Sequence, residues 1–295
     1  MGGCQSKNGS GAPTAPEAKD GETADRLWEL VALVKEKAPL VQCLTNFVSM
    51  DIMANGLLAI GASPAMVHAT GELEAAVPIV GAVGGCVSIN IGTLDERWIE
   101  SFKATVALCA ANNVPWVLDP VAAGFTPLRT TTAVELMTIA PPAVLRGNGS
   151  EILALAGASD CAGKGVDSTA GSDAALDAAK SLAAKFSCVV CVSGAVDYCV
   201  DPAGTVATCP HGHEMLTKVT ACGCLVTSVI GAFVAAKPPS MAVRDAAVFA
   251  FTFYGLCAEL AMRTSGGPGG FRVALMDALY NTTRETCDIP IASVV

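Results

Sequence analysis

The chain has 295 residues, which is enough for one large α/β domain or two ordinary ones. Hydrophobic residues make up 52% of it and charged residues only 15%, as expected where small residues pack helices closely onto a buried sheet. The net charge of -9, without a basic stripe, argues against nucleic acid as a partner but not against nucleotides, which need only one or two cations.

Thirteen cysteines in a chain without a recognisable secretory signal peptide predict reduced thiols and a cytoplasmic location. Cys188 and Cys191 have the spacing of a redox or metal pair, but the sequence around them, CVVCVSG, has the pattern of a buried strand. Because free cysteine behaves as a small hydrophobe, we expect both side chains to pack in the core.

Residues 1–22 are rich in Gly, Ser, Pro and Ala and show no apolar periodicity, so we expect a disordered tail there. Gly2 and Ser6 nevertheless fit the N-myristoylation pattern, and Cys4 stands where a palmitoyl group could be added. Two acyl chains would anchor the protein to a membrane surface stably, whereas one would anchor it marginally. The alternative is a chance match within a segment of low complexity.

Residues 23–290 are expected to form a single domain, because no internal repeat and no interdomain linker interrupts them. Helical periodicity covers residues 23–37. Short apolar runs then alternate with helical patterns and predict strands at residues 41–44, 65–68, 86–91, 116–121, 144–146 and 188–194. This alternation predicts an α/β fold with a mainly parallel central sheet, helices on both faces and right-handed crossovers.

The last third of the chain has a different pattern. Residues 198–209 resemble a hairpin and are followed by a turn at 210–212. Residues 223–284 read as almost entirely helical, with a Gly/Pro-rich loop at 265–270.

Polar residues stand at the ends of several predicted strands. They are Thr45, Asn46, His68, Asn90, Asp119, Arg146, Asn148, Ser193 and Gly194. Ligands of open α/β sheets bind at the carboxyl ends of the strands, so these residues are candidate ligand contacts. The alternative is that they cap the following helices, and Asn46 and Asn148 could do only that.

Two carboxylates at neighbouring strand ends suit a magnesium ion. Asp119 ends the apolar run WVLDPV, and Glu151 follows the strand that ends in Arg146. Such a pair could hold Mg²⁺ largely through water while the ion bridges nucleotide phosphates. Asp119 could instead cap a turn before Pro120, and Glu151 could interact with a helix dipole. Arg146 could bind a phosphate, pair with one of the carboxylates, or do both.

The stretch at residues 218–236, KVTACGCLVTSVIGAFVAA, runs from small residues and two cysteines into a long apolar helix. Its first turn should carry Gly223 and several amide N–H groups without an intrahelical partner, and such a helix start attracts anions. Cys224 in that turn is expected to have a lowered pKa and to face an attacking hydroxyl. The alternative is a helix that enters the core, with small residues present only for close packing.

Several motifs in one order resemble the hydroxyethylthiazole kinase family of the ribokinase-like superfamily, over about residues 30–280. They are CLTNFVSMDIMANGLLAIGASPAMVHA, LDPVAAGFTPLRT, LRGNGSEILALAG, the stretch at 218–236, and GGPGGFRVALMDALY. The resemblance implies a ribokinase-like single domain that forms homotrimers with active sites between subunits. It also implies transfer of the ATP γ-phosphate to 4-methyl-5-(2-hydroxyethyl)thiazole, a step of thiamine synthesis and salvage.

The resemblance also implies roles for individual residues. The thiazole contacts would be Asn46, Met66, Ala221 and Gly223, and the ATP contacts would be Arg146, Asn148 and Ser193. Asp119 and Glu151 would serve Mg²⁺. Cys224 would be the catalytic cysteine, standing where most ribokinase relatives place an aspartate.

The chain departs from the family pattern at one turn. The family usually has Gly-Thr-Gly-Cys, whereas this chain has Ala221, Cys222, Gly223 and Cys224. With a negative φ at Ala221, we expect an altered rate or KM more than inactivity. Two other functions are compatible with these features: a membrane-tethered binding or regulatory relative with weak catalysis, and a hydroxymethylpyrimidine-type kinase.

Overall fold

The computed structural model describes residues 17–159 and 171–291, and the acylation pattern at Gly2 and Cys4 lies outside them. Within the described residues eight strands form one sheet in the order β2-β1-β3-β4-β5-β6-β7-β8. The strands are β1 (Leu40–Leu44), β2 (Ser63–Ala65), β3 (Cys86–Asn90), β4 (Trp116–Asp119), β5 (Val144–Asn148), β6 (Val189–Ser193), β7 (Asp197–Val200) and β8 (Val206–Cys209).

The first six strands run parallel, and β7 and β8 add an antiparallel hairpin at one edge of the sheet. The helices are α1 (Glu17–Lys37), α2 (Met50–Ala59), α3 (Thr70–Ala82), α4 (Glu96–Asn112), α5 (Pro127–Ile139), α6 (Gly149–Ala158), α7 (Gly171–Phe186), α8 (Cys222–Ala236), α9 (Val243–Thr264), α10 (Pro268–Asn281) and the short 3-10 helix η1 (Glu214–Lys218). The predicted α/β fold with a mainly parallel sheet is confirmed.

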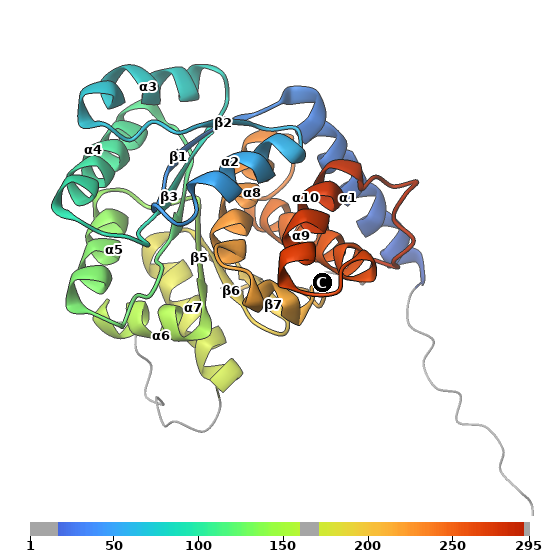
Figure 1. The fold of residues 1–295 in the computed structure, drawn as a ribbon. Helices are drawn as coiled ribbons and strands as arrows, with labels where there is room; N and C mark the ends of the chain where they lie inside the picture. The colour runs from blue at the N-terminus through green and yellow to red at the C-terminus, as the bar shows by residue number, and fades with distance from the viewer. Residues whose placement is uncertain (1–16, 160–170, 292–295) are drawn as a thin grey trace, which may run out of the picture.

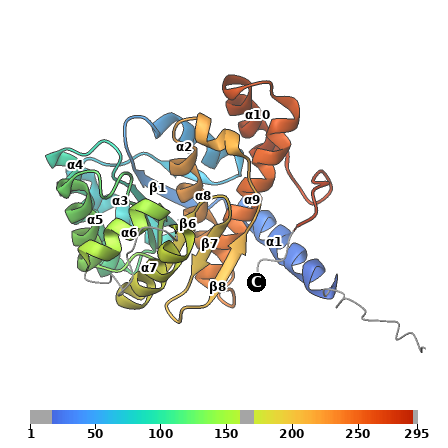
Figure 2. The same ribbon diagram turned by 90° about the horizontal axis from the view of Figure 1, so that it is seen from below.

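Helices cover both faces of the sheet. Helices α3 to α7 lie on one side of the sheet, and α1, α2, α8, α9 and α10 lie on the other, where α1 and α10 pack against other helices (Figures 1 and 2). Successive strand residues point to opposite faces, so in β4 Val117 joins the core beneath α8 while Trp116 and Leu118 join the opposite core. Burial on both faces explains why the strands read as continuous apolar runs.

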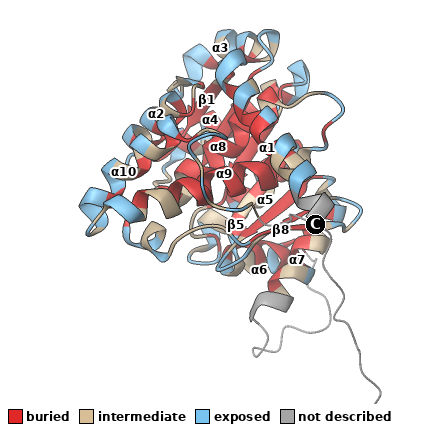
Figure 3. Ribbon diagram, turned by 90° about the vertical axis from the view of Figure 1, so that its right-hand side faces the viewer, coloured by how far each residue is buried: buried red, intermediate tan, exposed pale blue. Residues whose placement is uncertain are grey.

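Helix α8 lies centrally on its face of the sheet. It packs against β1, β3 and β4 and is covered in turn by α1, α2 and α9. Most of its residues are buried, as Figure 3 shows for α8 and the neighbouring α9. The predicted close core packing is therefore correct for the body of this helix, whereas its first turn lies at the sheet edge where the strands end.

Three elements begin two or more residues away from the start that the sequence suggests. Helix α1 begins at Glu17 rather than at residue 23. Strand β2 covers Ser63–Ala65 and so lies mostly before the predicted residues 65–68. Helix α10 begins at Pro268 inside the predicted loop, because proline is well suited to the first position of a helix, where its missing N–H is not needed.

Helix α9 is long and apolar enough to cross a membrane by length and composition, with a mean hydropathy of 1.3. However, 78% of that apolar window is buried inside the protein, where it packs against α8, α10 and the β7–β8 hairpin. Its composition is therefore explained by its place in the core. The cysteines among the described residues are free, and Cys188 and Cys191 are buried as predicted.

Candidate active site

The carboxyl ends of the parallel strands bring polar side chains together along one edge of the sheet. Asn90 ends β3 and lies in register with Asp119, the last residue of β4. Asn148 ends β5 and lies in register with Ser193 of β6. The strand-end residues singled out from the sequence therefore lie on neighbouring strands.

Asp119 is a buried carboxylate, only 1% exposed. Thr227 of α8 donates a hydrogen bond to its Oδ2 at 2.8 Å, and Arg146 Nη1 lies 3.7 Å from the same oxygen. Burial raises the pKa of Asp119 to about 7; the Arg146 charge opposes this shift and the Glu151 charge adds to it. A positive ligand beside Asp119 would favour its ionised form.

Arg146 links three parts of the site. Its Nη2 donates to Ser193 Oγ at 2.7 Å and its Nη1 donates to the Gly223 carbonyl at 3.1 Å. A Cβ at position 223 would lie 2.9 Å from Nη1, so Gly223 makes room for the guanidinium itself. The predicted ion pair between Arg146 and a carboxylate is present, and the same guanidinium stands at the first turn of α8.

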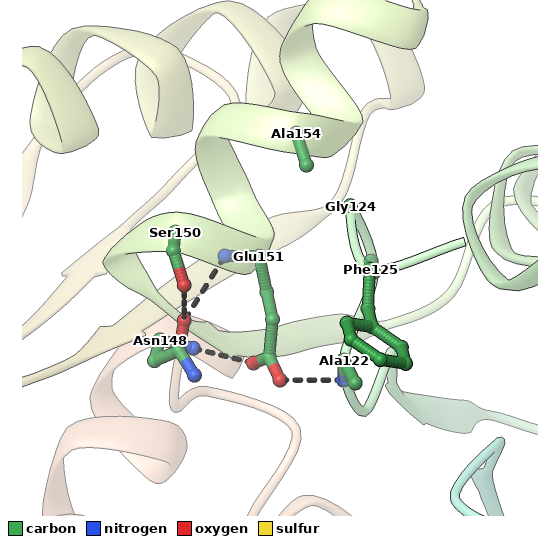
Figure 4. Close-up of a pocket in the computed structure, with 8 residues that line it drawn as sticks. Ala122, Gly124, Phe125, Asn148, Ser150, Glu151 and Ala154 are labelled. Atoms are coloured by element: carbon green, nitrogen blue, oxygen red, sulfur yellow. Dashed lines mark hydrogen bonds between the residues drawn. The ribbon is translucent and has the colours of Figure 1, made fainter. Parts of the chain in front are cut away.

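Asn148 and Glu151 form a capping box at the start of α6. Asn148 Oδ1 accepts from the Glu151 backbone N–H at 3.0 Å, and Glu151 Oε2 accepts from the Asn148 N–H at 2.8 Å. Glu151 Oε1 also accepts from the Ala122 N–H at 2.8 Å (Figure 4). The capping role considered for Asn148 is thus confirmed, Glu151 lies in the first turn of α6, and the cap fixes the Glu151 carboxylate against the loop after β4.

A pocket of about 540 Å³ opens beside this cap. Figure 4 shows the Phe125 ring, Ala122 and Gly124 on one side and the start of α6 on the other. Its lining residues are Ala122, Ala123, Gly124, Phe125, Asn148, Ser150, Glu151 and Ala154. The pocket gives a ligand access to the Glu151 side of the site.

Asp119 and Glu151 could hold a magnesium ion. Burial is the main cause of the raised pKa of Asp119, the Glu151 charge adds to it, and a divalent cation would relieve the repulsion between the two carboxylates. Within residues 17–159 and 171–291 no group of three or more His, Cys, Asp or Glu side chains comes together as a metal cage. Two carboxylates suit a cation that keeps several waters and binds substrate phosphates.

Cys224 lies in the first turn of α8, as predicted, but its thiol is not activated. Burial raises the pKa of Cys224 to about 11, and the Asp119 charge adds to this shift. The predicted lowered pKa is therefore wrong, because loss of hydration outweighs the effect of the helix start. Asn46 Nδ2 donates to the Cys224 Sγ at 3.7 Å, so Asn46 and Cys224 are brought together.

The turn that departs from the family pattern has an unusual backbone. Ala221 caps α8 with φ 66° and ψ 5°, in the left-handed region, so the negative φ on which the expected mild effect depends is not present. A Cβ in this conformation approaches the following carbonyl oxygen, and glycine avoids that strain. Cys222 is 2% exposed, which places its side chain in the core rather than in the site.

Met66, predicted to contact the thiazole, follows β2 and is half-buried. Like Ala221 and Cys224, it packs against the core that lies beneath α8. Among the described residues it forms no hydrogen bond with the polar groups of the site, so its assignment stays a prediction.

Sequence reasoning missed two side chains beside the site. The sequence pattern included Thr227 only as part of an apolar helix, although its hydroxyl donates to Asp119. Thr227 follows Gly223 by one helical turn, and this spacing could have shown that it faces the strand ends. Asp197 of β7 accepts from the Gly194 N–H at 3.0 Å, and burial raises its pKa to about 6. The sequence singled out Asn90 by its position at a strand end but assigned it no role.

Known proteins resemble this chain over most of its length. The model of the Hydroxyethylthiazole kinase family matches residues 31–285. A hydroxyethylthiazole kinase of Zea mays is 48% identical over 264 residues, which cover 88% of this chain and 90% of the maize protein. One of Cereibacter sphaeroides is 45% identical over 258 residues, covering 86% of this chain and 93% of the bacterial protein.

Solved structures give the same result for the fold. The hydroxyethylthiazole kinase protein of Pyrococcus horikoshii OT3 superposes with a TM-score of 0.79 at 37% identity, covering 88% of this chain and 94% of that one. An ADP/ATP-dependent NAD(P)H-hydrate dehydratase of Bacillus subtilis, at 15% identity and a TM-score of 0.50, shares the fold. The fold is ribokinase-like, and the chain belongs to the hydroxyethylthiazole kinase family.

Proposed function

We propose that this protein transfers the γ-phosphoryl group of ATP to the hydroxyl of 4-methyl-5-(2-hydroxyethyl)thiazole, in thiamine biosynthesis or salvage. One observation carries the proposal beyond family membership. Arg146, held by Ser193 and the Gly223 carbonyl, stands between the buried Asp119 and the first turn of α8. This arrangement brings the Arg146 guanidinium, the Asp119 carboxylate and the start of a helix together, and these groups suit the binding of a phosphoryl group during its transfer.

Each side of the site has a proposed role. Arg146, Ser193 and Asn148 bind ATP, with the guanidinium on phosphate oxygens and the helix start stabilising developing negative charge. Asp119 and Glu151 hold Mg²⁺ largely through water. When bound, the ion neutralises charge on the phosphate oxygens.

The thiazole lies on the other side, against Asn46, Met66, Ala221 and Gly223. Methionine sulfur is polarisable and suits an aromatic heterocycle. Cys224, with a neutral thiol, contacts the acceptor and positions it. Because phosphoryl transfer has a loose transition state, positioning and charge stabilisation matter more than a strong base.

The test is ADP release from MgATP and the thiazole alcohol by the purified protein, with thiazole phosphate identified by mass spectrometry. Tight thiazole binding without release of ADP would favour a binding or regulatory protein with weak catalysis. The left-handed conformation of Ala221, at the turn that departs from the family pattern, is the observation behind this alternative. Turnover of hydroxymethylpyrimidine alone would favour the pyrimidine kinase.

Replacing Asp119 by Asn tests the metal assignment. We expect kcat to fall about 100-fold or more, because the neutral amide binds a hydrated cation poorly. Asp95→Asn is the matched control, since Asp95 caps α4 and lies outside the site. Full activity of Asp119→Asn would remove Asp119 from the catalytic machinery.

We also propose a homotrimer. Phe47 and Val48 directly follow Asn46 and are 65% and 57% exposed, so a neighbouring subunit could cover them beside the thiazole side. Sedimentation equilibrium measures the assembly, and Phe47→Glu should weaken it. A wild-type monomer at micromolar concentration would contradict this proposal.

Acylation at Gly2 and Cys4 remains a proposal supported by the sequence pattern alone. It would bring an otherwise cytoplasmic enzyme to a membrane surface. Labelled myristate should be incorporated into the wild-type chain but not into Gly2→Ala, and an unlabelled wild type would exclude it.

A further inference from the structure

Asn90 occupies the centre of the site. It is the last residue of β3, only 1% exposed, and lies in register with Asp119. Its Oδ1 accepts from Asn46 Nδ2 at 2.7 Å and from the Gly92 N–H at 2.9 Å. These two hydrogen bonds connect the proposed thiazole side of the site to the strand that faces Asp119.

The orientation of the Asn90 amide follows from backbone groups. The Val48 and Ser49 N–H groups, which can only donate, both lie 3.0 Å from Asn46 Oδ1. Asn46 therefore presents its Nδ2 to Asn90, and Asn90 must present its oxygen in return. With Gly92 as second donor, both lone pairs of Asn90 Oδ1 are occupied.

The Nδ2 of Asn90 is left to face the site. It is buried and forms no hydrogen bond of ordinary geometry with the described residues. Burial raises the pKa of both Asp119 and Cys224, and weak side-chain hydrogen bonds from Asn90 to each of them oppose that rise. A buried amide whose hydrogens make only such weak contacts is costly unless a ligand accepts from it in better geometry.

Resting on the proposed function, we propose that Asn90 Nδ2 donates a hydrogen bond to the oxygen of the acceptor hydroxyl, which makes Asn90 a further catalytic residue. An amide N–H takes one lone pair of that oxygen and leaves the other free to attack phosphorus. As the new O–P bond forms and the bond to ADP breaks, the hydroxyl proton passes to an oxygen of the transferred phosphoryl group. Asn90 thereby distinguishes the alcohol from an analogue that lacks the hydroxyl.

The experiment compares binding of the thiazole alcohol and of 4-methyl-5-ethylthiazole, which lacks the hydroxyl, by calorimetry. The variants are Asn90→Thr and Asn90→Ala, since neither side chain has a group at the Nδ2 position. Ser88→Ala is the matched control, because Ser88 is on the same strand and its buried hydroxyl also lacks a hydrogen bond in the described structure.

We expect wild type and Ser88→Ala to prefer the alcohol by about 10-fold, and both Asn90 variants to bind the two ligands within about 2-fold. Unchanged affinity for the ethyl analogue would show that the ring pocket is intact. The kcat of the Asn90 variants should fall about 100-fold. A variant that loses turnover but keeps the wild-type preference would overturn the role of Asn90. A wild type that binds no thiazole would overturn the proposed function as well.

Discussion

At the scale of single residues, the site depends on groups whose surroundings change their ordinary chemistry. Burial keeps the Cys224 thiol neutral and moves the pKa of Asp119 towards neutrality. Ala221 holds a backbone conformation that glycine adopts more easily. These effects depend on burial and on backbone angles, which are set by the folded surroundings of a residue and not by its type.

Replacing Ala221 by Gly should stabilise the protein. Removing Cβ at φ 66° relieves about 1 kcal/mol of strain, so the melting temperature should rise by about 2–4 °C. Differential scanning calorimetry measures the shift. Ala232→Gly, in the interior of α8, is the control and should destabilise instead. A lower melting temperature for Ala221→Gly would contradict the left-handed conformation.

Thr227 should matter through its hydroxyl. In Thr227→Val the hydrogen bond to Asp119 Oδ2 is lost, and we expect kcat to fall about 10-fold as the carboxylate loses its orientation. Thr227→Ser retains the hydroxyl and should keep most of the activity. Equal kcat values for the Val and Ser variants would show that the hydrogen bond has no role in turnover.

The sequence singled out Asp119, Arg146 and Ser193 because polar residues that end apolar strands stand out, and the structure brings these three side chains together. It could not predict the pKa of Cys224, since the amount of water around a helix start depends on the packing of distant segments. The sequence singled out Asn90 by its position, but the orientation of its amide nitrogen became apparent only with Asn46 and Gly92 in place.

At the scale of elements, glycines decide how closely helices approach their neighbours. A Cβ on Gly255 of α9 would lie 2.6 Å from the carbonyl carbon and oxygen of His211, whose ring contacts Glu259. A Cβ on Gly231 of α8 would meet its nearest neighbour, Val117, at 3.4 Å. The first approach leaves no room for a side chain, whereas the second is an ordinary contact.

Alanine substitutions at the two glycines should therefore have opposite effects. Gly255→Ala should lower the free energy of unfolding by about 1–3 kcal/mol, because α9 must move away from His211. Gly231→Ala should raise it by up to about 1 kcal/mol through helix propensity. Urea unfolding of both variants measures the difference, and loss of stability in both would show that the two helix contacts are equally tight.

Periodicity predicted which segments are helices and which are strands, but it did not predict the bounds of short elements. Strand β2 has three residues at the sheet edge, too few to show a pattern, and it was placed late. The start of α10 was hidden by Gly269 and Gly270, which usually indicate a loop; the packing of Phe271 and Leu275 in the core overrides that preference.

At the scale of the whole molecule, the site takes side chains from Asn46 to Thr227, so its chemistry and the stability of the domain share the same buried groups. Asp197 is an example. It lies at the hairpin edge near Arg146, and burial raises its pKa above the usual value for an aspartate. Groups of this kind link global stability to pH.

Asp197→Asn should reduce that dependence. Because the pKa of Asp197 rises from 3.8 to about 6 on folding, the folded state binds more protons between these values, and wild-type stability falls as pH rises through this interval. The Asn variant keeps an acceptor for Gly194 and should be more stable by about 1–2 kcal/mol at pH 7.5, with little difference near pH 4. Melting curves at both values measure this, and equal melting temperatures at pH 7.5 would contradict it.

The central position of α8 also has a consequence for biosynthesis. The strands it covers, β1, β3 and β4, are complete by Asp119, whereas α8 begins at Cys222. The apolar face of these strands is formed by Val41, Cys86 and Val117. During synthesis it therefore stays without its covering helix until roughly a hundred further residues have left the ribosome. The nascent chain should need protection from aggregation during that interval, and closing such long-range contacts should make the final folding step slow.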